Sequence, residues 1–133
     1  MKQKVSKIKR IALTTLAAVC ALSSVAAISA SAETYEKLDK TVNGKHIYAL
    51  AERYSGYSKI SASSYSGPTE IKIFMESQQK NSSGNWIYPN VETDYSTSTS
   101  KSERINARSG YSVIITYGTV KFGGVGTYQM YKR

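Results

Sequence analysis

His46 is the only histidine of the chain and therefore its only imidazole for acid–base catalysis near neutral pH. A Ser–His–Asp triad would have to combine His46 with Asp39 or Asp94 and one of many serines, because the imidazole takes the hydroxyl proton while the carboxylate orients it. The Gly-x-Ser-x-Gly sequence that places a nucleophilic serine on a sharp turn in α/β-hydrolases is absent. We therefore expect His46 to be a surface residue of a strand and not a catalytic base.

Two pairs of carboxylates have a spacing that would bring them to one surface, as glycoside hydrolysis requires. Residues an even number of positions apart on a strand share a face, which applies to Glu70 with Glu76 and to Glu92 with Asp94. Water-facing strands carry such pairs for solvation alone, and the sequence favours this interpretation. We predict that the protein is not an enzyme and has no catalytic residues; a small cell-wall hydrolase is an alternative.

Metal and nucleotide sites find little support in the sequence. Cysteine and histidine each occur once, as Cys20 and His46, so a zinc site would need an unusual set of carboxylates. The Asp and Asn spacing of an EF-hand calcium loop is absent. The glycines of Gly123-Gly124-Val125-Gly126 precede no predicted helix, so they indicate a turn and not a phosphate-binding loop. We expect neither a metal ion nor a cofactor.

Aromatic side chains are the best candidates for binding, because the chain has 11 tyrosines, more than the core of a small domain can hold. A tyrosine offers a flat apolar face and a polar tip at a low entropy cost, which makes it a frequent contact residue. Trp86 fits either a plug between two sheets or an exposed platform for sugar stacking. The number of tyrosines is explained equally well if they only cover strand surfaces as cross-strand pairs. The candidate ligand-binding residues are Tyr57, Trp86, Tyr88 and Tyr95.

The N-terminal segment has the three zones of a signal peptide in their usual order. Met1–Arg10 carries five positive charges, Ile11–Ile28 is apolar apart from a few Ser and Thr, and Ala30-Ser31-Ala32 supplies small residues for cleavage. We predict cleavage after Ala32, which makes Glu33 the first residue of the mature chain. An uncleaved membrane anchor is the alternative, since the apolar stretch lies near the lower limit of about 17–25 residues for a spanning helix.

The predicted organisation is a signal peptide at residues 1–32 and a single β domain at residues 33–133. Cleavage removes Cys20, and a cysteine-free exported domain is unlike the disulfide-stapled scaffolds of oxidising compartments. It also leaves 13 Lys and Arg against 9 Asp and Glu, a net charge of +4, with the basic residues scattered along the chain. We expect no nucleic-acid partner, because such proteins carry basic blocks. The predicted location is secreted, either free or associated with the cell wall, with membrane contact only through an uncleaved signal peptide.

Alternating residues and turn signals predict β-strands throughout the mature chain. Asn43-Gly44 is the strongest short signal, because a type I′ hairpin turn needs positive φ at both positions. The second arm of this hairpin also fits a helical stripe through Ile47, Leu50 and Ala51. Pro89 lacks an N–H group, which places its strand at a sheet edge or at a bulge. The predicted strands are Glu36–Val42, Lys45–Arg53, Tyr57–Tyr65, Thr69–Gln79, Trp86–Tyr95, a short strand from Ile105, Gly110–Val120 and Thr127–Tyr131.

Two of these strands have side chains that alternate clearly enough to predict their faces. The core face of the strand Thr69–Gln79 is predicted to carry Ile71, Ile73 and Met75. In the strand Gly110–Val120, one face is predicted to carry Tyr111, Val113, Ile115 and Tyr117, with a bulge at Gly118. The polar tract Ser96–Lys101 is predicted to be an exposed connection between strands.

Six or seven short strands with frequent turn signals predict an all-β fold, either a small antiparallel β-sandwich or an open barrel. One part of the layout is an apolar strand, Ile71-Lys72-Ile73-Phe74-Met75, followed by a Gly-containing turn into Trp86. A Ser/Thr stretch and an apolar strand opened by Gly110-Tyr111 complete it. This layout resembles small exported β-sandwich proteins of Gram-positive bacteria. The resemblance implies an immunoglobulin- or fibronectin-like sandwich and no particular activity.

The function that these observations favour is an exported, non-enzymatic binding or interaction module that acts at or outside the cell envelope. Its expected partner is a cell-wall glycan, an anionic envelope polymer or a protein, and the sequence leaves these three open. A bacteriocin-like or toxin-like secreted antibacterial protein is the main alternative, because such proteins are also small, exported and positively charged.

Overall fold

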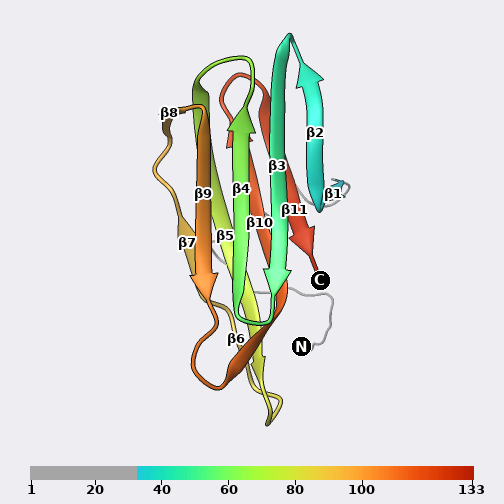
Figure 1. The fold of residues 1–133 in the computed structure, drawn as a ribbon, viewed down its shortest axis with the longest axis vertical. Helices are drawn as coiled ribbons and strands as arrows, with labels where there is room; N and C mark the ends of the chain where they lie inside the picture. The colour runs from blue at the N-terminus through green and yellow to red at the C-terminus, as the bar shows by residue number, and fades with distance from the viewer. Residues whose placement is uncertain (1–32) are drawn as a thin grey trace, which may run out of the picture. The chain divides into compact units, whose positions relative to one another are not determined.

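The computed structural model describes residues 33–133. The predicted signal peptide, with Ala30 and Ala32 of its cleavage site, lies outside the described residues. Within residues 33–133 the regular structure consists of eleven β-strands without a helix, which confirms the all-β prediction (Figure 1). This part of the chain also holds no helix that could cross a membrane. In chain order the strands are β1 (Thr34–Tyr35), β2 (Lys37–Val42), β3 (Lys45–Tyr54), β4 (Tyr57–Ser64), β5 (Thr69–Asn81), β6 (Trp86–Ile87), β7 (Asn90–Glu92), β8 (Ser96–Ser98), β9 (Ser100–Asn106), β10 (Tyr111–Phe122) and β11 (Gly126–Lys132).

The strands form two sheets that face each other across a shared core (Figure 1). The smaller sheet has the order β2-β3-β4-β9. The larger sheet has the order β1-β11-β10-β5, and β6, β7 and β8 follow one another along the free side of β5. All neighbouring strands run antiparallel except β1 and β11, which are parallel. Neither sheet closes on itself, so both keep free edges.

The core contains the apolar face of β5 as predicted. Ile71, Ile73 and Met75 are fully buried between the sheets, whereas Lys72 and Phe74 on the other face are partly exposed. Successive side chains of a strand point to opposite sides, so each inward apolar residue is followed by one on the outer surface. The outer face of the larger sheet therefore carries the even-numbered residues of β5.

The hairpin of β2 and β3 turns at the predicted Asn-Gly pair. Asn43 has a φ of 50° and Gly44 a φ of 78°, the positive values that a type I′ turn requires. In β3, Ile47 and Ala49 are buried and the intervening Tyr48 is half-buried, which is the period of a strand. The helical interpretation of this segment is therefore wrong.

Val113 and Ile115 of β10 are both buried, but the prediction that they share one face is wrong because the strand contains a bulge. Its pairing with β5 shifts register between Val113 and Ile115. An extra residue in one strand reverses the faces of the residues that follow. Gly118 pairs with the core residue Met75, so Ile115 and Tyr117 point to the outer side of the sheet, away from the face of Val113.

Gly118 lies beyond this bulge and has a different role. A Cβ atom at this position would meet the carbonyl oxygen of Phe74 and would lie 2.8 Å from Cδ1 of Ile60 in the opposite sheet. Glycine within a strand allows such a close approach because it has no side chain. The prediction of a bulge at Gly118 is therefore wrong, and glycine at this position allows a close contact between the two sheets.

The edge of the larger sheet also departs from the predicted strands. Pro89 interrupts Trp86–Tyr95, separates β6 from β7, and accepts a hydrogen bond of 2.8 Å through its carbonyl oxygen from the N–H of Ser77. The Ser/Thr tract is not a plain connection, because β8 pairs with β5 and β9 begins at Ser100. Its side chains lack apolar alternation, so the sequence carried no signal for this pairing.

Candidate functional site

Trp86 and Tyr88 lie side by side on the outer face of the larger sheet. Trp86 pairs with Lys80 of β5 and Asn90 pairs with Glu76, so residues 86, 88 and 90 share the outward face with the even-numbered residues of β5. The two aromatic rings are nearly parallel, with an interplanar angle of 7° and centroids 6.3 Å apart. They form an aromatic pair at the sheet edge.

This aromatic pair is accessible to a ligand. Trp86 is 37% exposed and Tyr88 is 49% exposed. Trp86 therefore faces outward and is not the plug between the sheets that its sequence position allowed. The ammonium group of Lys80 lies 5.3 Å from the centroid of the Trp86 ring, a favourable distance for a cation–π contact.

A buried carboxyl group, that of Glu76, lies next to the aromatic pair. Glu76 is only 5% exposed although it belongs to the outer face of β5. One of its oxygens accepts a hydrogen bond of 2.8 Å from the side-chain amide of Gln78. Burial raises the pKa of Glu76, because desolvation disfavours the carboxylate more than the amide hydrogen bond favours it.

Tyr117 of β10 extends this region toward the middle of the sheet. It pairs with Glu76 in register, and its hydroxyl oxygen accepts a hydrogen bond of 2.8 Å from the side-chain amide of Gln129 on β11. Burial raises the pKa of Tyr117 and of Tyr88, and the nearby Glu76 raises both further. The outer face thus combines two exposed rings with polar groups that are buried beside them.

The four candidate residues do not form one site. Tyr95 shares the outer face with Trp86 but lies near the opposite end of β5, with Lys121 5.1 Å from its ring centroid. Ser96 pairs with Ile71 and Trp86 pairs with Lys80, so about 27 Å of strand separates Tyr95 from Trp86. Tyr57 belongs to the other sheet, where the guanidinium of Arg104 lies 3.7 Å from its ring centroid.

Glu76, Gln78 and Tyr117 were not among the predicted binding residues, although Glu76 was considered as one half of a hydrolytic pair with Glu70. Alternation in β5 placed Glu76 and Gln78 on the outward face, which was the available signal. Their approach to Tyr88 depends on the pairing of β5 with β7 and β10, which joins positions far apart in the chain.

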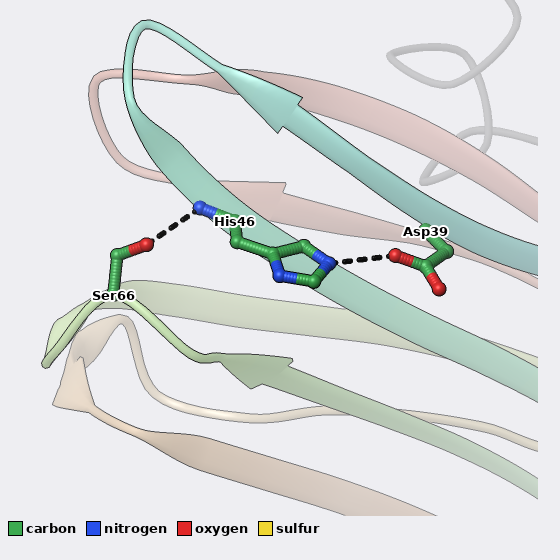
Figure 2. A network of polar contacts seen from close by, with 3 residues as sticks. All are labelled: Asp39, His46 and Ser66. Atoms are coloured by element: carbon green, nitrogen blue, oxygen red, sulfur yellow. Dashed lines mark hydrogen bonds and ion pairs between the residues drawn. The ribbon is translucent and has the colours of Figure 1, made fainter.

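His46 is within hydrogen-bond distance of Asp39 but does not form a Ser–His–Asp triad. Nε2 of His46 lies 2.7 Å from Oδ1 of Asp39, and both side chains are about half exposed. The hydroxyl oxygen of Ser66 accepts a hydrogen bond of 2.8 Å from the main-chain N–H of His46, on the far side from the ring's carboxylate contact (Figure 2). This serine is held by the backbone of His46 and not by its imidazole, which a triad would require.

Of the two carboxylate pairs considered for hydrolysis, one is too widely spaced and the other has a member that is engaged in an ion pair. Glu70 and Glu76 are six residues apart on one strand, which separates them by about 20 Å, well beyond the roughly 5–9.5 Å of glycosidase carboxyl pairs. Glu92 forms an ion pair of 3.2 Å with Lys72. Among residues 33–133, no group of three or more side chains is arranged to hold a metal ion.

Comparisons of the chain with protein families, with characterised proteins and with solved structures gave no match.

Proposed function

We propose that the protein is an exported, non-enzymatic binding module that acts at or outside the cell envelope, and that Trp86 and Tyr88 contact a glycan there. The observation that carries this proposal is the exposed, nearly parallel pair of rings at 7°. Parallel aromatic faces suit the flat C–H faces of sugar rings, because both surfaces are apolar and planar.

Polar groups beside the rings support a glycan over a purely apolar ligand. Glu76 and Gln78 lie on the same outward face, and Tyr88 is close enough for Glu76 to raise its pKa. Gln78 is partly exposed, so its amide can exchange hydrogen bonds with sugar hydroxyls, and the buried Glu76 orients that amide by accepting a hydrogen bond from it.

We also propose that the two sheets are an immunoglobulin- or fibronectin-like sandwich. The order β3-β4-β9 opposite β7-β5-β10-β11 corresponds to the immunoglobulin strands A-B-E opposite C′-C-F-G, with β2 added at the edge of the smaller sheet. The parallel strand β1 is a further addition, beside β11. Export is supported by the basic, apolar and small-residue zones of residues 1–32.

The proposed function is tested by the retention of purified protein on peptidoglycan and on wall polysaccharide. Tyr88→Ala should weaken binding about fivefold, because one aromatic contact contributes about 1 kcal/mol. Tyr65→Ala is the matched control, since Tyr65 is 64% exposed but directly follows β4 of the other sheet, where its N–H donates to the carbonyl oxygen of His46. His46→Ala should bind as the unmodified protein does.

Two results would overturn the proposal. An equal loss for Tyr65→Ala and Tyr88→Ala would mean that no particular tyrosine makes the contact. Hydrolysis of the wall material that disappears in His46→Ala would assign the protein to the enzymes.

A further inference from the structure

Two cations face each other across β4 and β9 on the outer surface of the smaller sheet. Lys59 pairs in register with Arg104, and Ser58 and Ile60 on either side of Lys59 are buried, so Lys59 points outward. Like charges directly opposite each other in a sheet are destabilising. A surface that keeps such a pair gains from an anion placed between the two side chains.

No carboxylate of the described residues forms an ion pair with Lys59 or Arg104. The lysine ion pairs of residues 33–133 join Lys72 to Glu92 and Lys132 to Glu36. Glu52 lies opposite Lys59 on β3, but its carboxylate accepts a hydrogen bond of 3.0 Å from the hydroxyl of Tyr54.

Arg104 is held in one orientation. Its guanidinium lies 3.7 Å from the ring centroid of Tyr57, and its Nε donates a hydrogen bond of 2.9 Å to Oδ1 of Asn106. Tyr54 packs against Tyr57 with ring centroids 4.7 Å apart, which supports the stack. Stacking occupies the face of the guanidinium and leaves its terminal amino groups to bind a phosphate oxygen pair.

Serine hydroxyls continue the surface beyond the cations. Ser61 pairs with Ser102, and Ser63 pairs with Ser100, in the next two outward rows of β4 and β9. Hydroxyls can donate to further phosphate oxygens. The serine rows themselves carry only polar side chains, so they suit contact with an extended hydrophilic chain.

We propose that Lys59 and Arg104, with Tyr57 and the serine rows, form a binding site for phosphate groups of a hydrophilic phosphodiester polymer. Lys59 supplies a compact charge, Arg104 supplies a planar fork of donors, and the serines follow the chain along the sheet. The site lies on the sheet opposite Trp86 and Tyr88 and does not depend on their role.

The proposal is tested by calorimetric titration of the protein with poly(glycerol phosphate) at low ionic strength. Lys59→Gln and Arg104→Gln should each weaken binding about tenfold. Arg104→Lys should restore only part of the affinity, because lysine keeps the charge but not the planar fork. Lys72→Gln is the control: it removes the same charge from the other sheet, where Lys72 is paired with Glu92.

The same titration distinguishes the alternatives. An equal loss for Lys72→Gln would show that net charge alone attracts the polymer, and would overturn the site. Binding to phosphatidylglycerol vesicles without binding to the polymer would assign the cations to a membrane surface instead. Unfolding midpoints that are no lower than that of the unmodified protein ensure that a lost affinity is not lost folding, since removing one cation of the pair relieves charge repulsion. If Lys59→Gln or Arg104→Gln has a lowered unfolding midpoint, the test relies on Arg104→Lys. This variant should bind the polymer more weakly than the unmodified protein, and equal binding would overturn the site.

Discussion

Glu76 is the residue whose chemistry departs most from its place in the fold, because it lies on an outer face and is still buried. Its raised pKa means that the unfolded chain releases the proton at a lower pH than the folded chain does. Between the two pKa values the unfolded state binds fewer protons than the folded state. The free energy of unfolding therefore falls as the pH rises above the ordinary pKa of 4.5 and through the raised pKa of the folded state. At a pH below both pKa values, Glu76 is protonated in both states and does not lower the stability.

We predict that Glu76→Gln removes the fall in stability with rising pH. The variant should be more stable than the unmodified protein at neutral pH and comparable to it in acid. Glutamine keeps the shape and can still accept the amide hydrogen bond from Gln78. Urea unfolding over a series of pH values measures the effect. Glu92→Gln, which changes an exposed carboxylate on the neighbouring strand, is the control. Parallel pH profiles for Glu76→Gln and the unmodified protein would contradict the prediction.

At the scale of the elements, the bulge in β10 separates two isoleucines that simple alternation treats alike. Ile73 is fully buried between the sheets, whereas Ile115 is 8% exposed and belongs to the outer face. We predict that Ile73→Ala lowers the free energy of unfolding by about 2–5 kcal/mol, because it leaves a cavity in the core. Ile115→Ala should cost less, since the neighbouring outer-face side chains can relax into the space.

Chemical denaturation of the two variants measures this difference. Equal losses would mean that Ile115 packs as a core residue and that the bulge does not change its environment. The comparison also tests the register between β10 and β5, on which the position of Tyr117 beside Glu76 depends.

At the scale of the whole molecule, the proposed export requires that residues 1–32 be removed. We predict a secreted form that begins at Glu33, so that the mature chain enters β1 at its second residue. Intact-mass analysis of a culture supernatant measures the start of the chain. A cell-bound species that retains Met1–Ala32 would contradict the prediction and favour a membrane anchor.

The sequence by itself determined the features that depend on neighbours in the chain. The Asn43-Gly44 turn and the buried face of β5 follow from local φ preferences and from the two-residue period of a strand. Pro89 predicted a sheet edge or a bulge because it lacks an N–H group, and the structure places it on the edge side of β5, between β6 and β7.

The tertiary structure alone decided the features that depend on which strands pair and in what register. The bulge before Ile115 arises in the pairing of β10 with β5, and no local pattern marks it. The meeting of Glu76 with Tyr88 and Tyr117, and of Lys59 with Arg104, likewise joins strands that are distant in sequence. A shift of one residue in register would move every side chain of a strand to the other face, so composition and periodicity identified the aromatic candidates but not their neighbours.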